Sequence, residues 1–169
     1  PGSPGDTFNE RIMAFNHSTD DGQTWQAEDQ IIGRSPPFRV WPDDTVDLLF
    51  ADNKGHVYIA FTLKQFSPDN SRIGFNSSSD FGVTWGSTVT IIEQPGAPDM
   101  GYERLIADES GKIYVVAAGQ SKQRGDFHIY MNASEYYGQT WIYDTSGAQV
   151  DSVGYSGPHC LDQFFKEIR

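Results

Sequence analysis

The chain has 169 residues and 14% aromatic residues, which suffices for one domain with a hydrophobic core and excludes a disordered composition. Its formal net charge of −11 is not offset by any basic cluster, and no apolar run reaches the length of a membrane span. We therefore expect neither nucleic acid nor a membrane span. The single cysteine, Cys160, excludes a disulfide framework within the chain and a cysteine-rich zinc site.

Three short runs alternate apolar and polar residues, which predicts β-strands: "RIMAFN" (11–16), "RIGFNS" (72–77) and "FHIYMN" (127–132). An octapeptide follows each run: "STDDGQTW" (18–25), "SSDFGVTW" (78–85) and "SEYYGQTW" (134–141). Apolar segments then return, so each octapeptide is predicted to be the turn of a hairpin. Asn16, Asn76 and Asn132 stand two residues before each octapeptide serine, and each opens a formal N-glycosylation sequon. The sequons recur because the repeat recurs.

A second repeated unit lies between the octapeptides. "DLLFADNKGHVYIAF" (47–61) aligns without a gap on "ERLIADESGKIYVVA" (103–117), which is 56 residues further along. Its central glycine, Gly55 or Gly111, marks the tip of another hairpin. Each repeat therefore contains four short antiparallel strands, which is typical of a β-propeller blade.

The predicted fold is all-β, a β-propeller of four-stranded antiparallel blades with about three blades' worth in this chain. We assign a half blade to 7–32, blades to 46–92 and 102–144, and a partial blade or a terminal helix to 145–169. Two or three blades cannot close a ring, and open sheet edges pair readily with other strands. We therefore expect either part of a longer propeller or a propeller completed by self-association.

The octapeptide, called the box below, resembles the Asp box (bacterial neuraminidase repeat) of sialidase-like propellers. The residues that carry the resemblance are Ser18, Asp20, Gly22, Thr24, Trp25, Ser78, Asp80, Gly82, Thr84, Trp85, Ser134, Gly138, Thr140 and Trp141. We interpret them as structural: aspartate accepts backbone N–H groups, glycine takes a positive φ, and tryptophan is buried beneath its hairpin. The third box has Tyr136 in place of the aspartate, so we expect its loop to be looser or differently bonded.

Antiparallel connectivity places the boxes and the glycine tips at one end of the strands, and the more varied loops at the other, non-box end. The resemblance to sialidases implies a site at the non-box end with arginines for a sugar carboxylate, a Tyr–Glu nucleophile pair and an aspartate acid/base. The candidates are Arg39, Trp41 and Arg104 for substrate binding and Asp43, Asp44, Tyr102 and Glu103 for catalysis. The alternatives are surface ion pairs for the arginines and packing under a proline-rich loop for Trp41. Adjacent strand residues point to opposite faces, which argues against a direct Tyr102–Glu103 pair.

Two functions remain open at this point. One is a sialidase-type exo-glycosidase or a piece of one, and the other is a non-catalytic propeller that binds a glycan or a protein. In both cases we expect a carbohydrate or protein partner, no cofactor and no metal, because the four histidines show no ligand spacing. We expect a secreted or extracytoplasmic protein.

Overall fold

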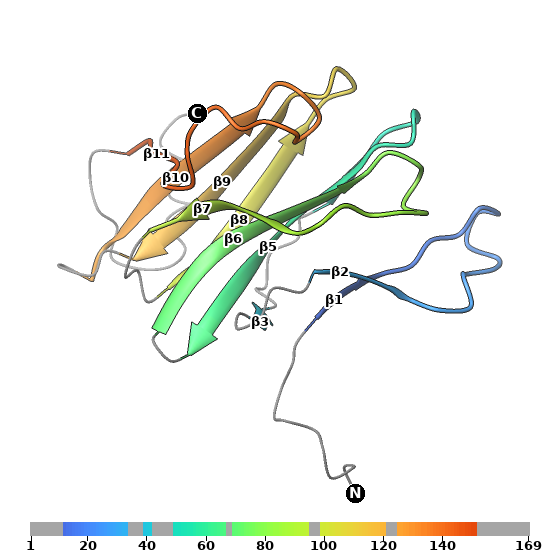
Figure 1. Ribbon diagram of the computed structural model, residues 1–169, viewed down its shortest axis with the longest axis horizontal. Coiled ribbons are helices and arrows are strands. Elements are labelled where there is room, and N and C mark those ends of the chain that lie inside the picture. The colour runs from blue at the N-terminus through green and yellow to red at the C-terminus, as the bar shows by residue number, and fades with distance from the viewer. Residues whose placement is uncertain are drawn as a thin grey trace, which may run out of the picture.

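The computed structural model describes residues 12–33, 39–41, 49–66, 69–94, 99–120 and 125–151 (Figure 1). Within these ranges the secondary structure is all β, arranged in three antiparallel sheets. The first sheet contains β1 (Met13–Phe15) and β2 (Gln30–Gly33). The second contains β3 (Arg39–Trp41), β4 (Leu49–Ala51), β5 (Val57–Phe66), β6 (Asp69–Ser78) and β7 (Val89–Glu93). The third contains β8 (Met100–Ala107), β9 (Ile113–Gln120), β10 (Phe127–Ser134) and β11 (Ala148–Gln149).

The two larger sheets repeat the same strand order. In the third sheet, β8, β9, β10 and β11 pair in chain order. In the second sheet, β5, β6 and β7 do the same, and both β3 and β4 pair with β5. Together β3 and β4 occupy the place that β8 alone fills in the third sheet. The second sheet therefore includes residues 39–41, which precede the blade predicted at 46–92. The chain is part of a β-propeller with antiparallel blades, as the repeat predicted.

The sheets stand side by side in the order of the chain (Figure 1). Apolar side chains fill the two spaces between them. Between the first and second sheets, Ile32, Phe61 and Leu63 are buried. Between the second and third, Phe75 and Ile113 belong to a larger buried cluster. Full burial of such a side chain contributes roughly 1.5–3 kcal/mol. The core therefore lies between the blades, and each blade depends on its neighbour.

Two of the three box tryptophans pack into these spaces, each against the preceding sheet. Trp85 packs edge-on against Phe15 of the preceding sheet, with ring centroids 4.9 Å apart. Trp141 makes the same contact with Phe75 at 5.0 Å. Trp85 also donates its indole N–H to the Gly82 carbonyl oxygen of its own box at 3.1 Å. Trp25 makes no such aromatic contact among the described residues and is 62% exposed, so its expected burial is wrong. In the second and third boxes, the tryptophan is a clamp between neighbouring blades.

The asparagine that precedes each box also joins blades. The Asn76 side-chain amide donates to the carbonyl oxygen of Ile32 at 2.6 Å, and Asn132 donates to that of Ile91 at 2.8 Å. Both acceptors belong to the preceding sheet, and both asparagines are buried. In the folded chain, neither side chain can accept an N-glycan. Their recurrence at a fixed place in the repeat reflects this shared structural task.

The box glycine allows a positive φ and, in two of the three boxes, the close approach of an aromatic ring. Gly22, Gly82 and Gly138 all have a positive φ, of 81°, 83° and 75°. A Cβ added to Gly82 would lie 2.4 Å from the Phe15 ring, and one added to Gly138 would lie 2.5 Å from the Phe75 ring. A Cβ added to Gly22 would meet no atom within 4 Å.

We therefore predict that Gly82→Ala is more destabilising than Gly22→Ala. Both replacements place alanine in the left-handed region, which costs roughly 1–2 kcal/mol. Only Gly82→Ala also displaces the Phe15 ring, which adds about 1–3 kcal/mol. The measurement is the free energy of unfolding in urea for both variants. If both variants lose the same free energy of unfolding, the positive φ alone would explain why the box requires glycine.

Candidate functional site

The structure describes the predicted substrate-binding and catalytic residues only in part. Arg39 and Trp41 lie on β3, where their backbones pair with Lys64 and Thr62 of β5. Asp43 and Asp44 lie outside the described residues. Tyr102, like Glu103, lies on β8, and only its backbone is described.

Glu103 is the described candidate with the most informative surroundings. Its side chain is buried, and its carboxylate accepts a hydrogen bond of 2.9 Å from the Thr62 hydroxyl. Thr62 lies on β5, directly opposite Trp41, so this hydrogen bond connects the second sheet to the third. A charged group this deeply buried requires specific polar partners. The carboxylate is therefore fixed where β3, β5 and β8 come together.

A β-bulge determines how Glu103 is presented. Gly101 pairs with Ala118 and Arg104 with Val116, so β8 carries one more residue than its partner between these pairs. A bulge breaks the strict alternation of side chains and re-aims them. The argument from alternation against a Tyr102–Glu103 pair consequently does not hold at this position, and the pairing stays a prediction. Bulges are over-represented next to active sites.

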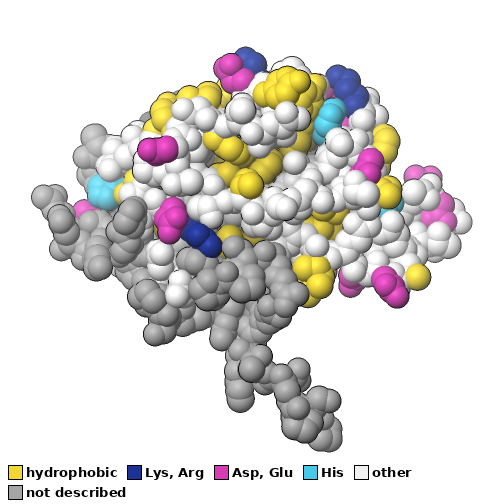
Figure 2. All heavy atoms as spheres, in the orientation of Figure 1, with side chains coloured by type: hydrophobic (Ala, Val, Ile, Leu, Met, Phe, Trp, Pro, Cys, Tyr) yellow, Lys and Arg dark blue, Asp and Glu magenta, His cyan; other side chains and the backbone are white. Residues whose placement is uncertain are grey.

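Charged residues accompany Glu103 at the non-box end of the strands. The Arg104 guanidinium donates to the Glu103 carbonyl oxygen at 3.2 Å. Lys64 pairs with Asp99 at 3.4 Å, and Arg72 lies 4.0 Å from Glu93. Arg104 thus holds the backbone of the bulge, and Lys64 and Arg72 each face a carboxylate at the same end. Surface ion pairs of Arg39 and Arg104 stay a prediction. On the face drawn in Figure 2, Lys and Arg side chains are dispersed and do not gather into a basic patch.

The first two boxes share one hydrogen-bond pattern. In the first, Asp20 accepts the backbone N–H and the hydroxyl of Thr24 at 2.7 and 2.6 Å, together with the hydroxyl of Ser18 at 2.7 Å. In the second, Asp80 accepts the equivalent three bonds at 2.8, 2.6 and 2.8 Å. The Thr24 hydroxyl, its N–H and Ser18 lower the pKa of Asp20 to about 2. Each aspartate thus bonds the turn of its own loop, and its assignment as a structural Asp-box residue stays a prediction.

The third box keeps its shape with fewer bonds. The Ser134 hydroxyl accepts the N–H groups of Tyr136 and Gly138 at 3.2 and 3.0 Å, as the serine does in the other boxes. Thr140 has no side-chain partner at position 136, since a tyrosine ring replaces the carboxylate. The N–H of Tyr137 donates to the Gly111 carbonyl oxygen at 2.8 Å, just as that of Phe81 donates to Gly55. The third loop is differently bonded, as expected, and the boxes and glycine tips share one end of the sheets.

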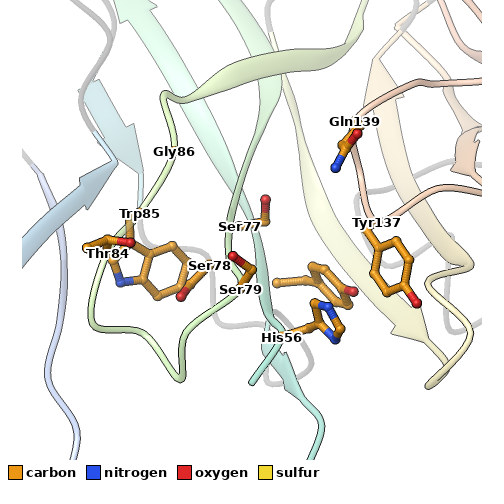
Figure 3. Close-up of a pocket in the computed structure, with 10 residues that line it drawn as sticks. His56, Ser77, Ser78, Ser79, Thr84, Trp85, Gly86, Tyr137 and Gln139 are labelled. Atoms are coloured by element: carbon orange, nitrogen blue, oxygen red, sulfur yellow. The ribbon is translucent and has the colours of Figure 1, made fainter. Parts of the chain in front are cut away.

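A pocket of about 430 Å³ lies at this box end, between the second and third boxes. In Figure 3, Thr84 and Trp85 of the second box stand on one side, Tyr137 and Gln139 of the third on the other, and His56 borders it from the start of β5. The sequence-based interpretation treated this end as structural and missed the pocket. The signal present in the sequence was the departure of the third box from the repeat at Tyr136 and Tyr137.

Fold and box loops together define this chain as a segment of a β-propeller. No protein-family model matches its sequence, and no curated protein matches it. Solved structures that resemble it include two glycosidases. One is the α-L-arabinanase of Penicillium chrysogenum complexed with arabinobiose, at 18% identity and a TM-score of 0.49. The other is the GH93 α-L-arabinofuranosidase of Fusarium graminearum, also with arabinobiose, at 14% identity and a TM-score of 0.46.

Each likeness covers 82% of this chain and 42% of the solved chain, so the sequence spans about two-fifths of the length of either structure. Neither likeness identifies the activity of this chain, and the resemblance to sialidases stays a prediction. Within the described ranges there is no helix long and apolar enough to cross a membrane. Those ranges also contain no cluster of three or more potential metal ligands.

The Asp20 carboxylate is predicted to titrate at about pH 2, below its ordinary value of 3.8. A lowered folded-state pKa means that the ionised group stabilises the fold above about pH 4, and that this contribution is lost as the pH falls through about 2. Thr24→Val removes the hydroxyl that lowers the pKa most, so the midpoint should rise toward 3.8. NMR titration of the Asp20 carboxyl carbon measures both midpoints. An unchanged midpoint in the variant would exclude the Thr24 hydroxyl as the cause.

Restoring the aspartate of the third box should stabilise the chain. Tyr136→Asp supplies an acceptor for the Thr140 N–H and hydroxyl, whereas Tyr136→Ala removes the ring without supplying one. We expect the aspartate variant to have a free energy of unfolding about 1 kcal/mol above that of the alanine variant, the net worth of a hydrogen bond. Urea denaturation of both proteins provides the comparison. Identical stabilities would mean that the third loop does not accept the bonding pattern of the other two.

Proposed function

We propose that this chain is part of a carbohydrate-recognising propeller whose main ligand binds at the non-box end, where β3, β5 and β8 meet. The observation that carries the proposal is the buried Glu103 carboxylate, held by Thr62 at a β-bulge between two blades. Carboxylates in such surroundings are frequently functional. Arg104 follows Glu103 in the chain, and Arg39 and Trp41 lie on the neighbouring β3.

The finer form of the proposal is recognition of an acidic sugar, as in a sialidase-type exo-glycosidase. Arg39 and Arg104 would pair with the sugar carboxylate, since guanidinium and carboxylate groups match in two-pronged hydrogen bonds. Trp41 would stack on the sugar ring. Tyr102 with Glu103 would act as the nucleophile pair, and Asp43 or Asp44 would transfer the proton to the glycosidic oxygen.

The second candidate is a non-catalytic module that binds a glycan or a protein through the same end of the sheets. The hydrogen bond from Thr62 favours it, because a carboxylate that joins two blades has a structural role without any chemistry. A glycan or protein would then contact the more exposed polar side chains around it. Both candidates are compatible with the predicted location outside the cytoplasm and with the predicted self-association.

Binding of 3′-sialyllactose to the 169-residue chain, followed by calorimetry, tests the acidic-sugar proposal. Arg104→Ala should weaken binding at least about tenfold, because a hydrogen bond to a charged group contributes roughly 1.5–3 kcal/mol. Lys112→Ala, which removes an exposed cation at the opposite end of the same sheet, is the matched control and should bind normally. Absence of saturable binding by the unaltered chain, or equal affinity in both variants, would contradict the proposal.

Hydrolysis of 4-methylumbelliferyl sialoside separates the enzyme from the binding module. If Glu103 takes part in the chemistry, Glu103→Gln should lower the rate by about 10²-fold or more while sialyllactose affinity is kept. The glutamine preserves the shape of the side chain and can still accept the Thr62 hydrogen bond. Binding without hydrolysis by the unaltered chain would identify the non-catalytic module.

A further inference from the structure

The pocket between the second and third boxes contains polar groups that the fold itself does not use. Tyr58, one of the lining residues, is 99% buried, and its hydroxyl has no hydrogen-bond partner among the described residues. An unpaired buried hydroxyl costs roughly 1–3 kcal/mol unless a further group satisfies it. Burial, with the nearby charge of Asp52, also raises the pKa of Tyr58. The hydroxyl is thus a neutral, unpaired donor and acceptor on a side chain that lines the pocket.

Other lining side chains are equally open to a ligand. Within the described part of the chain, Ser77 and Gln139 make hydrogen bonds only through their backbones, and no hydrogen bond involves the Ser79 side chain. The Tyr137 hydroxyl is not used in any hydrogen bond there either. These groups come from both boxes and from the strands between them, so they surround the pocket. A ligand rich in hydroxyl groups would satisfy several of them at once.

The His56 ring is oriented toward the same pocket. Its Nδ1 lies 2.7 Å from the Asp52 carboxylate, which leaves Nε2 for a ligand. Although burial opposes it, hydrogen bonding to the His56 side chain and backbone and to the Lys54 N–H lowers the pKa of Asp52. The ring also packs against Tyr137, with centroids 4.5 Å apart. Both side chains are therefore held in place before any ligand arrives, which reduces the entropy lost on binding.

The lining also favours a neutral ligand with one apolar face. None of the ten described lining residues is Lys, Arg, Asp or Glu, and the Asp52 and Asp80 carboxylates lie immediately behind His56 and Thr84. An anion would meet these carboxylates without a compensating cation. Trp85, Tyr58 and Tyr137 supply aromatic surface. Aromatic side chains with a few well-placed polar groups are characteristic of small-ligand sites.

From these observations we infer that the pocket between the second and third boxes is a binding site for a neutral saccharide unit. It is separate from the acidic-sugar site proposed at the non-box end and does not depend on it. Its hydrogen bonds to the sugar come from Tyr58, Gln139 and His56, and its apolar surface from Trp85. In this site the box loops act as ligand-binding elements as well as structural ones.

Titration with the neutral disaccharides arabinobiose and cellobiose, followed by NMR, tests the inference. Two variants remove a ligand contact: Tyr58→Phe and Gln139→Ala. Each has a control at the equivalent place in a neighbouring repeat, namely Tyr114→Phe for the first and Gln23→Ala for the second. We expect the pocket variants to bind at least one of the two disaccharides about 5- to 10-fold more weakly, which corresponds to one hydrogen bond, and the controls to bind normally.

Thermal unfolding distinguishes a lost contact from a damaged fold. Removing an unpaired buried hydroxyl should leave the melting temperature of Tyr58→Phe unchanged or raise it, while its affinity falls. If neither disaccharide binds saturably, or if Tyr58→Phe and Gln139→Ala bind both as tightly as the unaltered chain, the inference is wrong. Arg104→Ala should bind the neutral disaccharides normally, because Arg104 lies at the non-box end. The neutral-sugar site can therefore be tested even if the acidic-sugar proposal fails.

Discussion

The packing of the second and third box tryptophans on an aromatic residue of the preceding blade is the interaction on which this fold depends. Trp85 against Phe15 and Trp141 against Phe75 each contribute about 0.5–1.5 kcal/mol beyond the burial of their surface. The contact also brings the box glycine close to the same ring, so that only a residue without a Cβ fits. A single constraint thus accounts for two residues of the box and for their fixed spacing in the repeat.

Hydrogen bonds reinforce this contact where apolar packing alone would leave backbone groups unpaired. The carbonyl oxygens of Ile32 and Ile91 lie at the inter-blade space, and a buried asparagine amide from the next blade satisfies each of them. The box aspartates act within their own loops and remain at the surface, where they preserve the turn. The blades are consequently joined at the box end by aromatic rings and amides, and this end is built for rigidity.

At the non-box end a charged side chain takes part in the contact between blades. The Glu103 carboxylate is joined to Thr62 across the space between the second and third sheets, at a bulge that interrupts the regular pleat of β8. Buried carboxylates contribute less to stability than apolar side chains of similar size, because their desolvation is costly. The presence of a buried carboxylate at this contact between blades is the main reason to propose the principal function at this end.

The sequence by itself determined the all-β class, the four-strand repeat, the turn chemistry of Asp20 and Asp80 and the separation of the box end from the non-box end. These features are local, since strand alternation and turn hydrogen bonds involve a few neighbouring residues and recur as a pattern in the sequence.

Only the tertiary structure decided what each repeat contacts. The partner of Trp85 lies 70 residues earlier in the chain, the bulge at Gly101–Arg104 depends on pairing with β9, and the cavity at Tyr58 exists because the third box covers it. Tyr114, the equivalent of Tyr58 in the next repeat, is 41% exposed, because burial depends on the neighbouring blade and not on the residue itself.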